Sequence, residues 1–195
     1  KSAPVNHLSL ARFFLFGSRD IWFVVALPVF LHAQLQWSPI YVGGLLAAWV
    51  IAYGIVQALA PKLTGFSRQN APDGYHVWLW SLPLFVLPLL IAASVYFEWA
   101  VIPALTVGLL IYGAIFAINS AIHSYLIVSY ADAAGVSLDV GFYYMANAAG
   151  RLFGTLLSGW VYQVSGLAAC LVISALMILS ASFISKMLPR KDQTV

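Results

Sequence analysis

Two arginines lie in the middle of long apolar segments, and their chemistry is the most specific signal in the chain. Arg19 lies eleven residues after Leu8, and Arg151 lies twelve residues after Asp139. A guanidinium is charged at every physiological pH, and its planar fork of donors matches the oxygens of phosphate, arsenate and carboxylate groups. An arginine deep in a bilayer costs about 2.5–3.5 kcal/mol on insertion scales, so it normally faces protein or water. We therefore interpret Arg19 and Arg151 as candidate ligands of an anionic substrate.

The segment around Arg151 predicts a helix with one packing face and one polar face. Its sequence from Gly141 to Trp160 is GFYYMANAAGRLFGTLLSGW. Small residues recur at every fourth position, at Ala146, Gly150, Gly154 and Ser158. A polar stripe runs beside them at the same spacing, formed by Asn147, Arg151 and Thr155. Small residues let membrane helices approach closely, so we expect the first stripe to pack against another helix and the second to face a polar cavity.

Three further polar residues belong to the candidate site. Asn119 and Asn147 are candidates for hydrogen bonds to the substrate, and ordinary hydrogen bonds between helices are the alternative for both. Asp20 is a candidate for proton coupling or gating, because a buried carboxylate in a membrane protein can titrate during a transport cycle. The alternatives for Asp20 are to orient Arg19 or to pair with a basic residue outside this chain. His123 lies one turn after Asn119, near the end of its segment, where a bond between helices is favoured over substrate contact.

An internal ion pair is the alternative to substrate binding by either arginine. Asp20 is adjacent to Arg19, and adjacent side chains on a helix point about 100° apart. Asp139 lies about 18 Å from Arg151 along the same helix. We therefore expect neither carboxylate to be a good local partner of its arginine.

The composition indicates a polytopic membrane protein. Of the 195 residues, 63% are hydrophobic and 8% are charged, against about 25% charged residues in soluble domains. The net charge of +3 is not concentrated in a basic cluster with aromatic residues, which excludes a nucleic-acid partner. Cys170 is the single cysteine, so neither an internal disulfide nor a cysteine-based metal site is expected. We expect no metal and no cofactor, and we disfavour an intramembrane enzyme because the sequence lacks Gly-x-Ser-Gly and metal-binding motifs.

Six stretches are long and apolar enough to cross a bilayer, which takes about 20 residues in a helix. They cover residues 8–33, 40–60, 77–97, 101–128, 139–163 and 167–188. At 1.5 Å per residue, Arg19 and Arg151 each reach about 16–18 Å into their spans, near the middle of the hydrocarbon core. The third and sixth spans carry few polar residues, so we expect them to be outer helices that face lipid. Gly43, Gly44 and Gly54 in the second span are expected to permit close helix packing.

Basic residues predict the orientation of these spans. One side of the predicted bundle holds Lys1, Lys62, Arg68, Lys186, Arg190 and Lys191. Arg12 lies at the edge of that side, and the connections on the other side hold no lysine or arginine. The positive-inside rule therefore predicts that both termini are cytoplasmic.

Six helices with polar groups on the first, fourth and fifth resemble one half of a major facilitator superfamily transporter. In that fold, two six-helix halves surround a substrate site near the membrane midplane. The resemblance implies an all-α membrane protein with a single domain, residues 1–195. This domain corresponds to the C-terminal half of the transporter fold.

Three segments carry a closer resemblance. They are LSLARFFLFGSRDIWFVVALPVFL from Leu8 to Leu31, VGGLLAAWVIAYGIVQALAP from Val42 to Pro61, and SYLIVSYADAAGVSLDVGFYYMANAAGRLFGTLLSGWVYQ from Ser124 to Gln163. Together they resemble the C-terminal half of the ArsJ-type organoarsenical efflux permeases. The resemblance implies export of 1-arseno-3-phosphoglycerate across the bacterial inner membrane, and hence arsenate resistance. It also implies a functional link to a glyceraldehyde-3-phosphate dehydrogenase, which makes this ester.

The resemblance leaves two questions of function open. The six N-terminal helices of the family are missing, and the sequence starts at Lys1, so we expect a cut fragment or a chain that pairs with a separately encoded half. Export of another phosphorylated or carboxylated small molecule is the alternative function. A passive assembly subunit is disfavoured, because it would not retain two costly arginines in the membrane.

Overall fold

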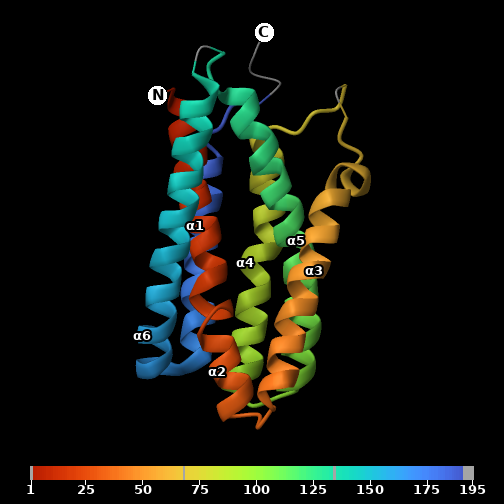
Figure 1. The fold of residues 1–195 in the computed structure, drawn as a ribbon, viewed down its shortest axis with the longest axis vertical. Helices are drawn as coiled ribbons and strands as arrows, with labels where there is room; N and C mark the ends of the chain where they lie inside the picture. Colours follow the sequence, from red (N-terminus) through yellow and green to blue (C-terminus); the bar gives the residue numbers. More distant parts are fainter. Residues whose placement is uncertain (1, 68, 134, 191–195) are drawn as a thin grey trace.

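All regular structure in the described part of the chain is helical. The computed structural model describes residues 2–67, 69–133 and 135–190. Its helices are α1 (Ala3–Phe23), α2 (Ala26–Ala33), α3 (Pro39–Thr64), α4 (Gly74–Tyr96), α5 (Val101–Tyr130) and α6 (Val136–Ser185). They run along the long axis of an elongated bundle (Figure 1). Within the described ranges, five helical stretches are long and apolar enough to cross a membrane, with α1 and α2 counted as one, as a multi-pass membrane protein requires.

Gly166 interrupts α6. Its φ of 74° and ψ of −175° lie outside the helical region, in a conformation that is open almost exclusively to glycine. The chain turns back at this point, so residues 136–165 and 167–185 run in opposite directions (Figure 1). We call these two parts the first and second legs of α6.

α1 and α2 form one bent path through the bundle. The helix is interrupted between Phe23 and Ala26, just before Pro28. Proline lacks an N–H, and its ring clashes with the carbonyl group four residues earlier, here that of Val24. Ala26 begins α2, where N–H groups have no acceptor in their own helix. The Ser158 hydroxyl oxygen accepts the Ala26 N–H at 3.0 Å, so the first leg of α6 stabilises the bend.

The small-residue stripe of α6 packs directly against α1, as predicted. Gly150 lies against the backbone of Phe13, and Gly154 lies against the backbone of Gly17. A Cβ atom added at Gly154 would come within 2.5 Å of the Gly17 carbonyl oxygen. The two helices are therefore so close that neither glycine tolerates a side chain unless the backbone moves.

α3 is the helix that the rest of the chain covers least. In its apolar window 11% of the residues are buried, against 67% in the stretch of α1 and α2. Trp49 attaches α3 to α5, since its indole N–H donates to the Leu109 carbonyl oxygen at 2.8 Å. No neighbouring element of the described chain lies within 4 Å of a Cβ atom placed on Gly43, Gly44 or Gly54. The prediction that these glycines permit close packing is therefore wrong within this chain, because α3 presents them on an open face.

The third and sixth predicted spans correspond to α4 and the second leg of α6. Both have a buried face, with Val77 and Leu84 in α4 and Leu171 and Ile178 in the second leg. In the apolar window of α4, 39% of the residues are buried. The least covered helix is thus the second span, whose sequence is no more apolar than that of the third.

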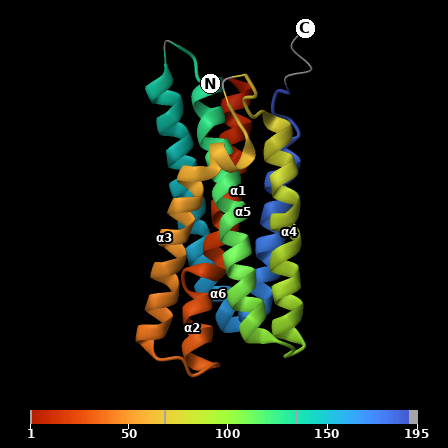
Figure 2. The same cartoon turned by 90° about the vertical axis from the view of Figure 1, so that its right-hand side faces the viewer.

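The start of α1 and the residues after α6 lie at the same end of the bundle (Figure 1, Figure 2). At this end the Gly74 N–H donates a hydrogen bond to the Pro189 carbonyl oxygen at 3.1 Å. The end of α3 also lies here (Figure 1). Three of the basic residues that predict the orientation are described, namely Lys62 in the last turn of α3 and Lys186 and Arg190 after α6. The other three, Lys1, Arg68 and Lys191, lie outside the described residues.

Candidate functional site

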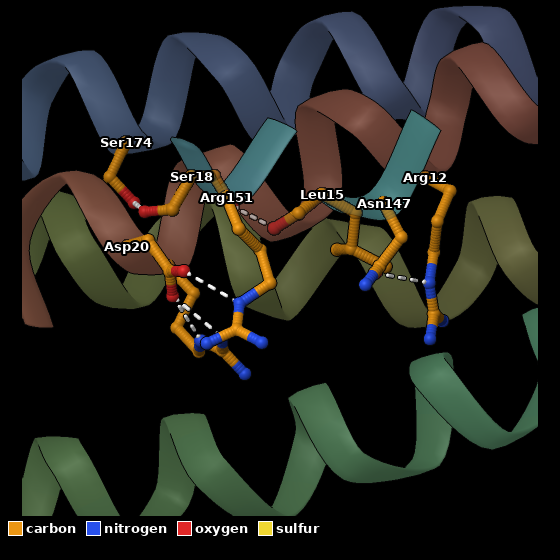
Figure 3. A network of polar contacts seen from close by, with 8 residues as sticks. Arg12, Leu15, Ser18, Asp20, Asn147, Arg151 and Ser174 are labelled. Atoms are coloured by element: carbon orange, nitrogen blue, oxygen red, sulfur yellow. Dashed lines mark hydrogen bonds and ion pairs between the residues drawn. The ribbon is translucent and has the colours of Figure 1, made fainter. Parts of the chain in front are cut away.

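Asp20 joins the two predicted arginines into one ionic cluster. Its Oδ1 atom lies 2.6 Å from both Nε and Nη2 of Arg19, and its Oδ2 atom accepts a hydrogen bond from Nε of Arg151 at 3.0 Å. Arg19 and Asp20 belong to α1, whereas Arg151 belongs to the first leg of α6 and extends toward Asp20 (Figure 3). The two arginines therefore lie at one level of the bundle.

The prediction that Asp20 is a poor partner for Arg19 is wrong. The Asp20 side chain is 1% exposed, and an unpaired carboxylate in such a position costs several kcal/mol. An unfavourable rotamer costs only about 0.5–1.5 kcal/mol. The long Arg19 side chain therefore bends across the angle between adjacent residues and reaches the carboxylate. This agrees with the alternative in which Asp20 orients Arg19.

The two arginines differ in exposure. The side chain of Arg19 is 11% exposed, whereas that of Arg151 is 54% exposed. Arg151 is bonded through Nε alone, and no residue in the described ranges accepts a hydrogen bond from its two terminal nitrogens. These nitrogens form the part of the fork that binds two oxygens of a phosphate or arsenate group. Arg151 is thus oriented by Asp20 and still free to bind an anion.

Two serine hydroxyls fix the backbone of α1 beside Asp20. The Ser18 hydroxyl donates to the Leu15 carbonyl oxygen at 2.6 Å. The Ser174 hydroxyl, on the second leg of α6, donates to the Ser18 carbonyl oxygen at 2.6 Å. Both serines are fully buried, and the Ser18–Ser174 pair lies next to Asp20 (Figure 3). The second leg therefore holds in place the turn of α1 that carries the carboxylate.

A third arginine, Arg12, lies in the interior, and the sequence analysis missed it as a site residue. The positive-inside pattern placed it at the edge of the predicted cytoplasmic side and gave it no role in the site, but Arg12 is only 4% exposed. Its Nε donates to Oδ1 of Asn147 at 3.0 Å, and its Nη1 donates to the Ser120 hydroxyl at 3.0 Å and to the Ser120 carbonyl at 3.2 Å. The signal that points to Arg12 is its position seven residues before Arg19, which puts both on one face of α1.

The two predicted asparagines have different surroundings. Asn147 accepts the hydrogen bond from Arg12 and so belongs to the polar side of the first leg. Asn119 is fully buried, and its Nδ2 donates to the Val77 carbonyl oxygen at 3.3 Å and to the Ser81 hydroxyl at 3.1 Å. Asn119 therefore links α5 to α4, which was the alternative role, and the structure does not bring it to Asp20.

The ring of Phe16 lies between Arg12 and Arg19. The guanidinium carbons of the two arginines lie 3.9 and 4.9 Å from the ring centroid, within the range of cation–π attraction. Phe116 of α5 packs edge-on to Phe16, with ring centroids 5.1 Å apart. The aromatic pair thus fills the space between the Asp20 cluster and Arg12.

An apolar hollow lies between α3 and α5, and none of Arg12, Arg19 and Arg151 lines it. It has a volume of about 190 Å³, and its lining includes Ala60, Pro61, Ile118 and Ile122 but no charged residue. In the part of the chain that the structure describes, no group of three or more histidine, cysteine, aspartate or glutamate residues is arranged to hold a metal ion. The candidate site is therefore the arginine cluster.

Comparison with known proteins returns no relative, since neither a protein-family model nor a curated protein matches this chain.

Proposed function

We propose that this chain is one six-helix half of a major facilitator superfamily transporter that exports an anionic organoarsenical, 1-arseno-3-phosphoglycerate, by alternating access. The carrying observation is the cluster of Arg19, Asp20 and Arg151, in which the Arg151 guanidinium is half exposed well inside an apolar helix. An arginine that faces lipid at such a position costs about 2.5–3.5 kcal/mol. A watery cavity that admits anions removes this cost and supplies a ligand for the terminal nitrogens of Arg151.

The length of α6 supports six membrane crossings. α6 contains 50 residues, whereas a single crossing takes about 20. Its two legs, together with α1–α2, α3, α4 and α5, make six segments and leave both ends of the chain on one side. The basic residues at that end favour the cytoplasm of a bacterium, with the chain in the inner membrane.

The open face of α3 supports a second half as partner. α3 and the first leg of α6 border the same long side of the bundle, with α1 and α5 between them (Figure 1, Figure 2). α3 exposes Ile40, Tyr41 and Ile51 as well as its open glycines. An N-terminal six-helix half packed on this side, from the same polypeptide or a separate one, would enclose the arginines in a cavity.

The geometry of Asp20 supports a role in coupling or gating. An anion on the terminal nitrogens of Arg151 competes with Asp20 for the charge of the same guanidinium. Anion binding therefore weakens the bond between Arg151 and Asp20, while Arg19 keeps its own contact with the carboxylate. This exchange links occupancy of the site to the contact between α1 and the first leg of α6, which is the kind of contact that changes in alternating access.

The cargo follows from the resemblance together with the arginines. A glyceraldehyde-3-phosphate dehydrogenase would supply the arsenate ester, and the chain itself would act as a transporter, not as an enzyme. Because a guanidinium fork binds phosphate, arsenate and carboxylate oxygens alike, the alternative cargo is another phosphorylated or carboxylated small molecule.

The test uses arsenate-sensitive bacteria that express the complete gene for this protein together with a glyceraldehyde-3-phosphate dehydrogenase. In arsenate medium, the gene is expected to lower cellular arsenic and restore growth. Arg151→Gln is expected to abolish this effect, whereas Arg190→Gln, which removes a positive charge at the end of the bundle, is expected to preserve it. If the unaltered gene leaves cellular arsenic unchanged, the arsenical is not the cargo, and exchange assays with phosphate esters then test the alternative.

A further inference from the structure

Arg12 is a buried cation with no carboxylate partner among the described residues. In residues 2–67, 69–133 and 135–190, no carboxylate oxygen lies within 4.0 Å of its nitrogens. Its acceptors are the neutral groups of Asn147 and Ser120. Neutral acceptors satisfy hydrogen bonds but do not neutralise the charge, so Arg12 differs from Arg19 and Arg151, which share a carboxylate.

The three arginines carry more positive charge than the carboxylate that contacts them offsets. Arg12, Arg19 and the half-exposed Arg151 contribute three charges, and within the described ranges Asp20 is the carboxylate that lies within 4.0 Å of their nitrogens. Uncompensated charge inside a membrane protein is costly, and residues of this kind normally mark a ligand path or pair with an opposite charge. A ligand with two anionic groups would balance the excess.

The remaining nitrogen of Arg12 is placed to meet such a ligand. Nη2 donates no hydrogen bond to any residue that the structure describes, so its N–H groups remain for a ligand. The side chains of Arg12 and Arg151 extend from α1 and α6 toward the same side (Figure 3). Arg12 is bonded to Asn147, which lies one helical turn before Arg151, so the two anion positions are neighbouring but distinct.

We infer that Arg12 is a second anion subsite, which binds the second anionic group of the proposed cargo. One group binds the terminal nitrogens of Arg151, and the other binds Nη2 of Arg12. This inference rests on the proposed anion transport and adds to it a residue that selects between cargoes with one and with two charged ends.

The test compares two small phosphate esters that differ in the second charge. The protein is purified together with the half that is proposed to enclose the arginines and is placed in lipid nanodiscs. It is titrated calorimetrically with 3-phosphoglycerate, which has a phosphate and a carboxylate, and with glycerol 3-phosphate, which has the phosphate alone. The expected preference for 3-phosphoglycerate is roughly tenfold, which corresponds to about 1.4 kcal/mol. Arg12→Gln is expected to abolish the preference and leave glycerol 3-phosphate binding unchanged.

A matched control is Ser120→Ala, which removes a neutral partner of Arg12 but keeps the charge, so the preference is expected to persist. Helical circular dichroism checks that each variant folds. Equal binding of the two esters by the unaltered protein overturns the second subsite, without the need for a variant. A folded Arg12→Gln protein that retains the preference also overturns it. Loss of both esters in Arg151→Gln supports the primary site, whereas an unaltered two-half transporter that binds neither ester removes the proposed function itself.

Discussion

The carboxylate of Asp20 and the guanidinium of Arg151 are 131 positions apart in the chain, and they meet at 3.0 Å across the contact between α1 and α6. Asp20 is almost completely buried, whereas Arg151 is half exposed. The pair therefore joins the interior of the bundle to its surface. Its energetics are expected to be asymmetric, because solvent screens the exposed partner and not the buried one.

The first prediction concerns loss of the Asp20 charge. Asp20→Asn leaves the buried Arg19 without a counter-charge, and breaking a buried pair in this way costs roughly 3–5 kcal/mol. Because the bond to Arg151 is partly screened, we expect a loss of about 2–4 kcal/mol in the free energy of unfolding, measured by denaturant titration in detergent. Glu98→Gln, at an exposed residue outside the helices, is the control and is expected to change it by less than about 0.5 kcal/mol. A loss below about 1 kcal/mol for Asp20→Asn would show that the carboxylate is not the centre of the cluster.

The second prediction concerns the contact of α1 with the first leg of α6. A methyl group at Gly150 collides with the backbone of Phe13, so Gly150→Ala is expected to lower the free energy of unfolding by about 1–3 kcal/mol. Gly43→Ala is the matched control, because its new methyl group meets no neighbouring element of the described chain. In the helix interior that change is expected to be neutral or stabilising by up to about 1 kcal/mol. Similar effects from the two substitutions would contradict the close approach of α1 and α6.

The third prediction concerns the bend between α1 and α2. Ser158→Ala removes the acceptor of the Ala26 N–H and leaves a buried donor without a partner. The expected loss in the free energy of unfolding is about 1–3 kcal/mol. Ser180→Ala is the comparison, since the Ser180 hydroxyl donates only to Leu176 in its own helix. If both serines prove equally dispensable, the bend is stabilised by Pro28 alone.

The fourth prediction concerns the reversal at Gly166. Its backbone conformation is nearly exclusive to glycine, so Gly166→Ala is expected to destabilise the fold by roughly 1–3 kcal/mol. Gly159→Ala, in the first leg of α6 with open space around it, serves as control. The thermal unfolding temperature of the two variants in detergent measures the difference. An unaffected Gly166→Ala variant would indicate that the chain passes from one leg to the other by a different backbone path.

Much of the fold could be predicted from local properties of the sequence. Runs of about 20 apolar residues mark the spans, and the recurrence of Gly150 and Gly154 every fourth residue predicts a face that packs closely. Pro28 predicts a kink for a local steric reason. The glycines of α3 show the limit of this reasoning, because the same residue type at Gly43 lies on an open face. A stripe of small residues permits close approach, but whether a second helix is there depends on the rest of the bundle.

The sequence by itself determined that arginines lie inside an apolar chain and that Arg19 and Arg151 lie at similar depth in their spans. Only the tertiary structure decided that Asp20 joins these two arginines, that Arg12 is interior, and that Asn119 is bonded to α4. The physical reason is that depth follows from counting residues at 1.5 Å each, whereas side-chain partners depend on how each helix is rotated about its axis. That rotation is fixed by contacts between distant segments, such as Gly154 against Gly17.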